Sequence, residues 1–320
     1  MSALPSVVAH ADWSTDPRKR WMAVAVRDTA GSFRATAPEL VGDLATLFAR
    51  LTARADTQGA VLLGVDCPIG VPRRWAARAD VTDFRALLPE LGRGAWADFF
   101  WPAATPDEIG LRRPFYPYRS NGKRRAHLVR ALGAASFGEL NRRCELAGNG
   151  RRAACVLFWT LGSNQVGKAA IVCWRDLIAP SIQGGLDLGV WPYDGDFADL
   201  LATRAVVVAE TYPAEVYRHF DLAMGRRRGS KTNQADRRKD APKLTDVAAA
   251  LGVTLAPDLD ATIADGFGSA KGGDDPFDAT VGLFGMLNVV RGRRPSGEPD
   301  DDPAIRSVEG WIFGQAAVST

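Results

Sequence analysis

The chain has 320 residues, of which 46% are hydrophobic and 24% are charged, and its formal net charge is +3. This composition is typical of a soluble globular protein and excludes a disordered chain or a polycation. No apolar run approaches the roughly 20 residues that cross a bilayer, so we expect no membrane association. The length is long for one simple domain and short for two large ones, and it allows a substantial core. We expect a single domain over residues 1–320.

The first part of the chain predicts a mixed sheet. Short apolar runs favour strands over residues 6–11, 20–28 and 32–39, and the turn "DTAG" would join the last two as a hairpin. Residues 39–55 have apolar side chains at helical spacing. Residues 59–72 form a continuous apolar run, which is typical of a strand buried on both faces. A meander followed by a crossover therefore opens the fold.

The middle of the chain is less regular. Residues 73–150 predict an inserted subregion of helices and loops after the fourth strand. Residues 153–162 are compatible with a further strand, and residues 168–182 predict a helix. The run at 204–220 predicts the fifth strand of the main sheet.

The last part predicts helices and loops. Residues 225–243 are basic and polar, and we expect a loop, mobile or partly helical. The other expected segments are helices at 244–253, 258–267 and about 275–290, a loop at 291–303, and a last strand or tether at 306–314. The whole is an α/β domain with a mixed five-stranded sheet flanked by helices.

The cysteines predict reduced thiols. They are widely spaced, with no CxxC pair and no zinc-ligand spacing: Cys67, Cys144, Cys155 and Cys173. The start, "MSALPSVVAH", lacks the charged and apolar regions of a signal peptide. We therefore expect a cytoplasmic protein.

Three apolar strands end on a carboxylate. Asp12 follows "VVAHA", Asp66 follows "VLLGV", and Glu210 follows "AVVVA". Neighbouring strand ends lie at one edge of a sheet, where they form rigid mounts for functional side chains. Mg²⁺ and Mn²⁺ prefer oxygen ligands, so these three residues predict an acidic metal site.

A helix start adds more carboxylates. In "GGDDPFDATVGLFG", Asp274 and Asp278 are four residues apart and Asp275 and Asp278 three apart, which places them on one face of a helix. Two-metal phosphoryl chemistry needs several carboxylates to hold its ions. The conjunction of this helix with the strand ends is what predicts such a site.

Each acid also has a structural interpretation. Asp12 in "ADWS" and Asp66 before "CPIG" are compatible with ordinary turns. Asp275 before Pro276 is compatible with a helix N-cap followed by proline at the first helical position, and Asp278 would complete a box-like cap. A capped helix can also hold a ligand, so both interpretations stay open.

Four pieces of the chain resemble a known family. The stretches "GVDCPIGVP", "AETYPAEVYR", "DDPFDATVGL" and "VEGWIFG" are similar to a bacterial family of predicted RNase H-like nucleases (domain of unknown function 429). The resemblance covers most of the chain, although residues 73–150 carry little of it. It implies an RNase H-like fold with an acidic site for Mg²⁺ or Mn²⁺.

The resemblance also implies roles for individual residues. Asp12 matches the acid of the first strand and Asp66 the acid of the strand after the first helix, whereas Asp275 and Asp278 match the last core helix. Glu210 belongs to the pattern of this family itself. The expected metal ligands are the four aspartates, and Glu210 joins them as a catalytic candidate. One departure is "DWSTDPRKRW", which is longer than a tight hairpin.

A competing phosphate motif lies at residues 162–169. The sequence "GSNQVGKA" matches GxxxxGK through Gly162, Gly167 and Lys168, but Ala169 stands where a P-loop has a hydroxyl for magnesium. We expect a tight glycine turn from which Lys168 contacts a substrate phosphate. A plain loop is the alternative.

Two basic clusters could hold a phosphate backbone. Arg124 and Arg125 lie in "RSNGKRRAH", and Arg227 lies in "RRRGSK". We take these three arginines, with Lys168, as candidate contacts to substrate phosphate. Solvated surface charge is the alternative.

The sequence thus predicts a metal-dependent nuclease that hydrolyses phosphodiesters of a nucleic acid by a two-metal mechanism. One alternative is a nucleotide-binding protein or small-molecule phosphotransferase that uses the same acids and the "GSNQVGK" turn. Another is a non-catalytic nucleic-acid-binding module.

Overall fold

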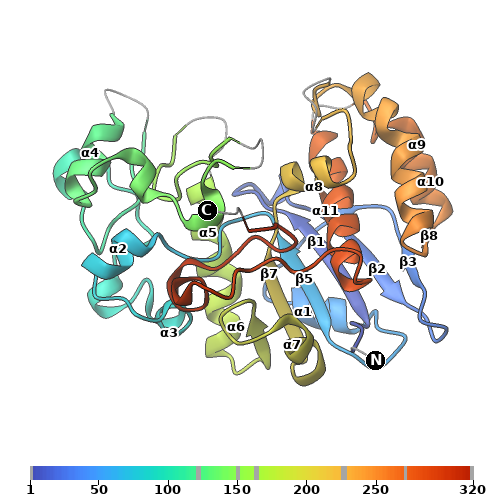
Figure 1. The fold of residues 1–320 in the computed structure, drawn as a ribbon, viewed down its shortest axis with the longest axis horizontal. Helices are drawn as coiled ribbons and strands as arrows, with labels where there is room; N and C mark the ends of the chain where they lie inside the picture. The colour runs from blue at the N-terminus through green and yellow to red at the C-terminus, as the bar shows by residue number, and fades with distance from the viewer. Residues whose placement is uncertain are drawn as a thin grey trace.

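A computed structural model describes residues 3–119, 124–148, 152–161, 166–224, 229–269 and 272–317 (Figure 1). Its centre is one mixed sheet of eight strands in the order β6-β7-β5-β1-β2-β3-β8, with β4 paired to β2. The strands are β1 (Val7–Asp12), β2 (Trp21–Arg27), β3 (Phe33–Ala35), β4 (Glu39–Leu40), β5 (Val61–Val65), β6 (Leu188–Val190), β7 (Val206–Glu210) and β8 (Val253–Leu255).

The α/β class and the mixed sheet are confirmed, but the expected count of five strands is wrong. The three additional strands, β4, β6 and β8, are only two or three residues long. A run this short cannot show the alternation by which a strand is recognised in a sequence.

Helices cover both faces of the sheet (Figure 1). The α-helices are α1 (Leu47–Thr52), α2 (Arg73–Arg78), α3 (Phe84–Leu87), α4 (Arg125–Ala131), α5 (Val166–Cys173), α6 (Ala179–Gln183), α7 (Phe197–Thr203), α8 (Pro213–His219), α9 (Gln234–Ala250), α10 (Pro257–Asp265) and α11 (Asp274–Val290). The 3-10 helices are η1 (Pro17–Lys19), η2 (Leu88–Glu90), η3 (Gly94–Trp96), η4 (Pro106–Glu108), η5 (Phe137–Leu140) and η6 (Arg143–Glu145), and two π-helical segments are η7 (Trp174–Ile178) and η8 (Ile305–Glu309).

The central strands set the register of the functional edge. β1 pairs antiparallel with β2 and parallel with β5, and β5 pairs parallel with β7. His10 is opposite Gly64, which in turn is opposite Ala209. The carboxyl ends of β1, β5 and β7 therefore lie side by side.

Side chains point to alternate faces along each strand, and this divides the core into two clusters. Val8, Leu62 and Val207 pack with the side chains of α8–α11 on one face. Val7 and Val61, on the other face, pack with α1, α5 and the insertion. Since successive strand residues point to opposite faces, each strand contributes to both clusters.

Helix α11 lies unusually close to β1. It crosses β1 and β2, and a Cβ at Gly282 would clash with the ring of His10. Only glycine fits at this contact. The close approach places the start of α11 over the carboxyl end of β1.

The insertion at residues 73–150 shares the core of the sheet. Its described part contains short helices, and the buried rings of Trp75, Phe84 and Phe99 belong to the same cluster as Val61 and Val206. Phe84 and Phe99 contact Trp174 of η7. The insertion thus lies against the sheet as a wall beside its carboxyl edge (Figure 1).

Several local expectations need correction. The described part of 153–162 contains no strand, only an isolated bridge between Trp159 and Tyr116. The helix expected at 39–55 is short, because residues 39–40 pair with β2. The basic segment 225–243, expected as a loop that is mobile or partly helical, is partly helical, because α9 begins at Gln234. The expected final strand or tether is η8 followed by a single bridge from Ile312 to Glu210.

Two further expectations concern the whole chain. All four cysteines are described, and all are free thiols. Within the described ranges, no helix is both long enough and apolar enough to span a membrane.

Candidate functional site

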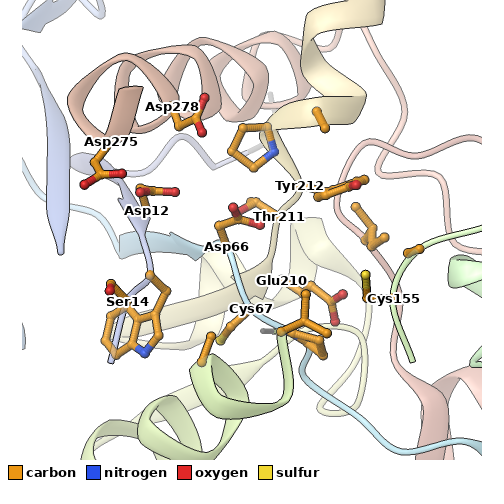
Figure 2. Close-up of a pocket in the computed structure, with 18 of the residues that line it drawn as sticks. Asp12, Ser14, Asp66, Cys67, Cys155, Glu210, Thr211, Tyr212, Asp275 and Asp278 are labelled. Carbon is orange, nitrogen blue, oxygen red and sulfur yellow. The ribbon is translucent and has the colours of Figure 1, made fainter. Parts of the chain in front are cut away.

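A cavity of about 720 Å³ opens at the carboxyl edge of the central strands, below the start of α11 (Figure 2). Acidic side chains dominate the charged groups among its described lining residues. The acids are Asp12, Asp66, Glu145, Glu210, Asp274, Asp275 and Asp278, and the basic residues are Lys19, Arg142 and Lys231.

Two aspartates come from adjacent parallel strands. Asp12 is the last residue of β1, and Asp66 directly follows β5, where its N–H donates to the carbonyl oxygen of Ala11 at 3.0 Å. Strand alternation puts Asp12 on the face of His10 and Asp66 on the face of Gly64. His10 and Gly64 both lie against α11, so they are on the same face of the sheet. The two carboxylates therefore share one side of the sheet.

Helix α11 supplies the remaining carboxylates. Figure 2 shows Asp12, Asp66 and Asp278 pointing toward a shared space, with Asp275 beside Asp12. Asp278 is buried and accepts from the Tyr217 hydroxyl and from the Lys231 ammonium. The expected convergence of two strand ends and a helix start is therefore observed.

The capping interpretation of these aspartates is wrong. Helix α11 begins at Asp274, its N-cap residue is Gly273, and no side chain caps it. Pro276 is consequently the third residue of the helix, and Asp275 and Asp278 lie within it. Neither residue therefore caps α11, although Asp274 and Asp275 lie in its first turn, where the helix dipole favours negative charge.

Glu210 lies on the other face of the sheet. Its two oxygens accept from the Arg142 guanidinium at 2.6 Å each, and one also accepts from the Ile69 N–H at 2.6 Å. Arg142 is fully buried and also bonds Glu145 at 2.9 Å. Glu210 thus anchors the insertion to β7 and to the loop after Asp66.

One residue beyond Glu210, the chain returns to the acidic face. Thr211 lies beside His10, whose Nδ1 donates to the carbonyl oxygen of Ala279 at 3.1 Å. Burial lowers the pKa of His10 to about 3, so the ring is neutral and Nε2 accepts from the Thr211 hydroxyl at 2.8 Å. These bonds join β1, β7 and α11 below the carboxylates.

The carboxylates of the cavity are hard to ionise together. Burial, and then the charge of Asp66, raises the pKa of Asp12 well above its usual range. Burial raises the pKa of Asp66 to about 7 and that of Asp275 to about 6, with the charge of Asp274 also acting on Asp275. Burial likewise raises the pKa of Asp278, followed by the charges of Asp12 and Asp66.

The negative charge of Asp66 adds to burial in raising the pKa of Asp12. Carboxylates that lie close together in a buried site disfavour each other's ionised form. The pair therefore needs additional positive charge to be fully ionised at neutral pH.

The chemistry of this donor set fits a hard divalent cation. Several carboxylates on rigid elements supply oxygen ligands, and burial, together with neighbouring carboxylates, raises their pKa values. As the side chains stand, no group of three or more His, Cys, Asp or Glu in the described ranges is arranged to hold an ion. Binding an ion would require the side chains to close around it.

Lys168 does not line the cavity. It is half-buried on α5, where Val166 and Ala169 are the lining residues. A Cβ at Gly167 would clash with the carbonyl oxygen of Leu157, so close packing explains this glycine. The described residues before the motif form no strand, and Gly162 lies outside the described residues. The structural context of a P-loop is therefore missing.

Two of the three candidate arginines, Arg124 and Arg125, are not among the lining residues of the cavity. Arg124 is the N-cap residue of α4, and Arg125 stacks over the ring of Phe137 at 4.7 Å and near that of Trp159 at 5.9 Å. Arg227 lies outside the described residues.

Sequence reasoning missed the main cation of the site. Lys231 lies in the basic segment, but nothing in "RRRGSK" separates it from its neighbours. Tyr217 could have been found, since it lies on α8, the helix that directly follows the strand ending at Glu210. His10 could also have been found, because it is two residues before Asp12 and therefore on the same face.

Comparisons of the chain with models of protein families, with curated proteins and with solved structures found no match.

Proposed function

We propose that the protein is a metal-dependent phosphodiester hydrolase of the RNase H-like type, with nucleic acid as its substrate. One observation carries the proposal: Asp12, Asp66 and Asp278, from three separate elements, converge on one cavity (Figure 2). Asp275 extends this set at the mouth. Carboxylate clusters of this kind are the usual ligands for the ions of two-metal phosphoryl chemistry.

The order of the central strands supports the RNase H-like assignment. β2 and β3 extend antiparallel from one side of β1, and β5 and β7 extend parallel from the other. This is the three-strand meander and crossover that the family resemblance implies. The four aspartates that the resemblance matches to acids all line the one cavity.

The chain's own residues would hold and orient the ions. Bound Mg²⁺ or Mn²⁺ would supply Lewis acidity toward the phosphate and would lower the pKa of a water nucleophile. Asp12 and Asp66 are mounted on central strands, and Tyr217 orients Asp278 through its hydroxyl. Glu210 acts at a distance, by bonding Arg142 and the loop that follows Asp66.

A second candidate function has one observation in its favour. The cavity volume of about 720 Å³ falls within the range of roughly 300–1,000 Å³ that is typical of small-molecule sites. A small phosphate ester or a nucleotide would fit such a volume. The same carboxylates would then serve a phosphotransferase or a small-molecule phosphohydrolase.

Cleavage of a substrate panel tests the proposal. The panel holds single- and double-stranded DNA, RNA, an RNA–DNA hybrid, a branched junction, and ATP and a nitrophenyl phosphodiester, each with Mn²⁺. We expect a nucleic acid to be cleaved, and Asp66→Asn to lower the rate at least roughly a hundredfold, as loss of a transition-state contact does. The control is Asp246→Asn, because Asp246 is exposed on α9 and does not line the cavity.

The outcomes separate the candidates. Cleavage that survives in Asp66→Asn would overturn the assigned site. Turnover of ATP or of the nitrophenyl ester alone would replace the nuclease with the small-molecule enzyme. Absence of turnover throughout the panel would count against both.

A further inference from the structure

Lys231 places a positive charge inside the acidic cavity. Its ammonium forms an ion pair with Asp278, whose side chain is only 2% exposed, whereas the side chain of Lys231 is 44% exposed. The lysine thus reaches from the mouth of the cavity to a buried carboxylate. Ordinary surface pairs have two exposed partners and contribute little, so this pair is of a different kind.

The backbone of Lys231 is held in place by a buried arginine. Arg237 is 2% exposed, and it donates to the carbonyl oxygens of Lys231, Gly266 and Gly268, the last two at 2.8 Å. Its guanidinium also packs against Gly273, where any Cβ would clash with it. Arg237 therefore fixes the lysine relative to the start of α11.

The charge of Lys231 acts on the whole carboxylate set. It counteracts the rise in pKa of Asp12, Asp66 and Asp275, and it pairs directly with Asp278. Lys19, the other lysine among the described lining residues, is exposed, and its charge acts on Asp275. Lys231 differs from it because its ammonium is ion-paired with a buried carboxylate of the set.

We propose that Lys231 is a built-in counter-cation of the metal site, whose ammonium leaves Asp278 when a divalent ion binds. The inference rests on the proposed function, because it takes the aspartates as metal ligands. An ammonium and a divalent ion at one carboxylate would repel each other strongly at contact distance in a buried site. The two cations must therefore compete for Asp278.

Calorimetric titration with Mn²⁺ tests the competition without any substrate. Lys231→Met keeps the apolar stem and removes the charge, and Lys19→Met is the matched control in the same cavity. We expect Lys231→Met to lower the Kd at least roughly tenfold, which corresponds to about 1.4 kcal/mol. Lys19→Met should change the Kd by less than about threefold, as expected for an unpaired, solvent-screened charge.

Equal Mn²⁺ affinities of the wild type and Lys231→Met would overturn the inference. An equal fall of the Kd in Lys231→Met and Lys19→Met would also overturn it, since any removed positive charge near the cavity would then have the same effect. A wild type that binds Mn²⁺ weakly beside a Lys231→Met variant that binds it well would support it. Binding that is absent in all three proteins would overturn the inference together with the metal site.

A second measurement uses the wild type alone, in case the variant folds poorly. Acetylation of Lys231 by an activated ester is followed by mass spectrometry with and without Mg²⁺. A lysine released from its ion pair should react faster, so we expect labelling of Lys231 to rise several-fold with Mg²⁺, while labelling of Lys239 on α9 stays constant. Unchanged labelling at a saturating Mg²⁺ concentration would overturn the inference.

These readouts are independent of catalysis. If Mn²⁺ binds and displaces Lys231 but no substrate is cleaved, the counter-cation stands and the proposed nuclease falls. If substrates are cleaved but Lys231 does not respond to metal, the nuclease stands and the counter-cation falls.

Discussion

At the scale of single residues, the cavity concentrates acid groups whose pKa values are raised by burial. Burial raises the pKa of Asp66 to about 7 and that of Asp275 to about 6, from an ordinary value of 3.8. Such a carboxylate is easily protonated in the folded chain and difficult to ionise. The site thus lowers the stability of the metal-free protein, which is a common property of functional sites.

The raised pKa values make the stability of the metal-free protein depend on pH. Because the folded-state pKa values exceed the unfolded ones, folding takes up protons and stability falls as pH rises from about 4 to about 7. In a buffer that contains a metal chelator, the Tm of the protein should therefore be lower at about pH 8 than at about pH 5.5. Mn²⁺ should restore the Tm at the higher pH, because it binds the ionised carboxylates of the folded state only.

Thermal melts followed by circular dichroism check this prediction. Asp66→Asn serves as the comparison. It removes one carboxyl group with a raised pKa, so the Tm of this variant should depend less on pH. A metal-free wild type whose Tm rises steadily between these pH values would contradict the assigned burial of the acids.

At the scale of elements, two contacts position the site. The Arg142–Glu210 pair joins the insertion to β7, and both side chains are buried. The contact of Gly282 with His10 sets the distance between α11 and β1. Neither contact involves a proposed metal ligand. Glu210 also accepts from the Ile69 N–H in the loop after Asp66, and the Gly282 contact joins the two elements that carry Asp12 and Asp278.

Removing Arg142 should be costly. Arg142→Met leaves Glu210 and Glu145 buried without their partner, and breaking a buried ion pair in this way typically costs about 3–5 kcal/mol. Arg204→Met is the control, since its pair with Asp187 is exposed and is worth less than about 1 kcal/mol. Urea denaturation measures both changes, and a small loss in Arg142→Met would show that the pair does not anchor the insertion.

Replacing Gly282 with alanine should destabilise the protein, although alanine favours helices by about 1 kcal/mol over glycine. The added methyl group meets the His10 ring, and overpacking of this kind costs about 1–3 kcal/mol. Mn²⁺ affinity should fall as well, because α11 would move away from β1. Gly110→Ala is the control, since a Cβ there has open space around it; if both variants melt alike, α11 is not held by this contact.

At the scale of the whole molecule, one sheet unites segments that are far apart in the chain. The cavity takes its walls from the first strand, the insertion and the last long helix, over residues 12–312. The expected element types hold for β1, β2, β5, β7, α5, α10 and α11. The net charge of the whole chain is +3, although most of the charged residues that line this cavity are acidic.

Local pattern alone determined the parts of the site that lie on strongly patterned elements. The apolar runs before Asp12, Asp66 and Glu210 identify buried strands, and the periodicity after Asp275 identifies a helix. Such patterns depend on neighbouring residues only, so they are readable in the sequence. The α/β class and the expected meeting of the strand-end aspartates with α11 followed from them.

Only the tertiary structure decided which side chains face one another. It places Glu210 on the opposite face with Arg142, because one residue along a strand reverses the direction of a side chain. It makes Gly273 the N-cap of α11, and it brings Lys231 to Asp278 across 47 residues of chain. These contacts depend on the packing of distant segments, which leaves no periodic trace in the sequence.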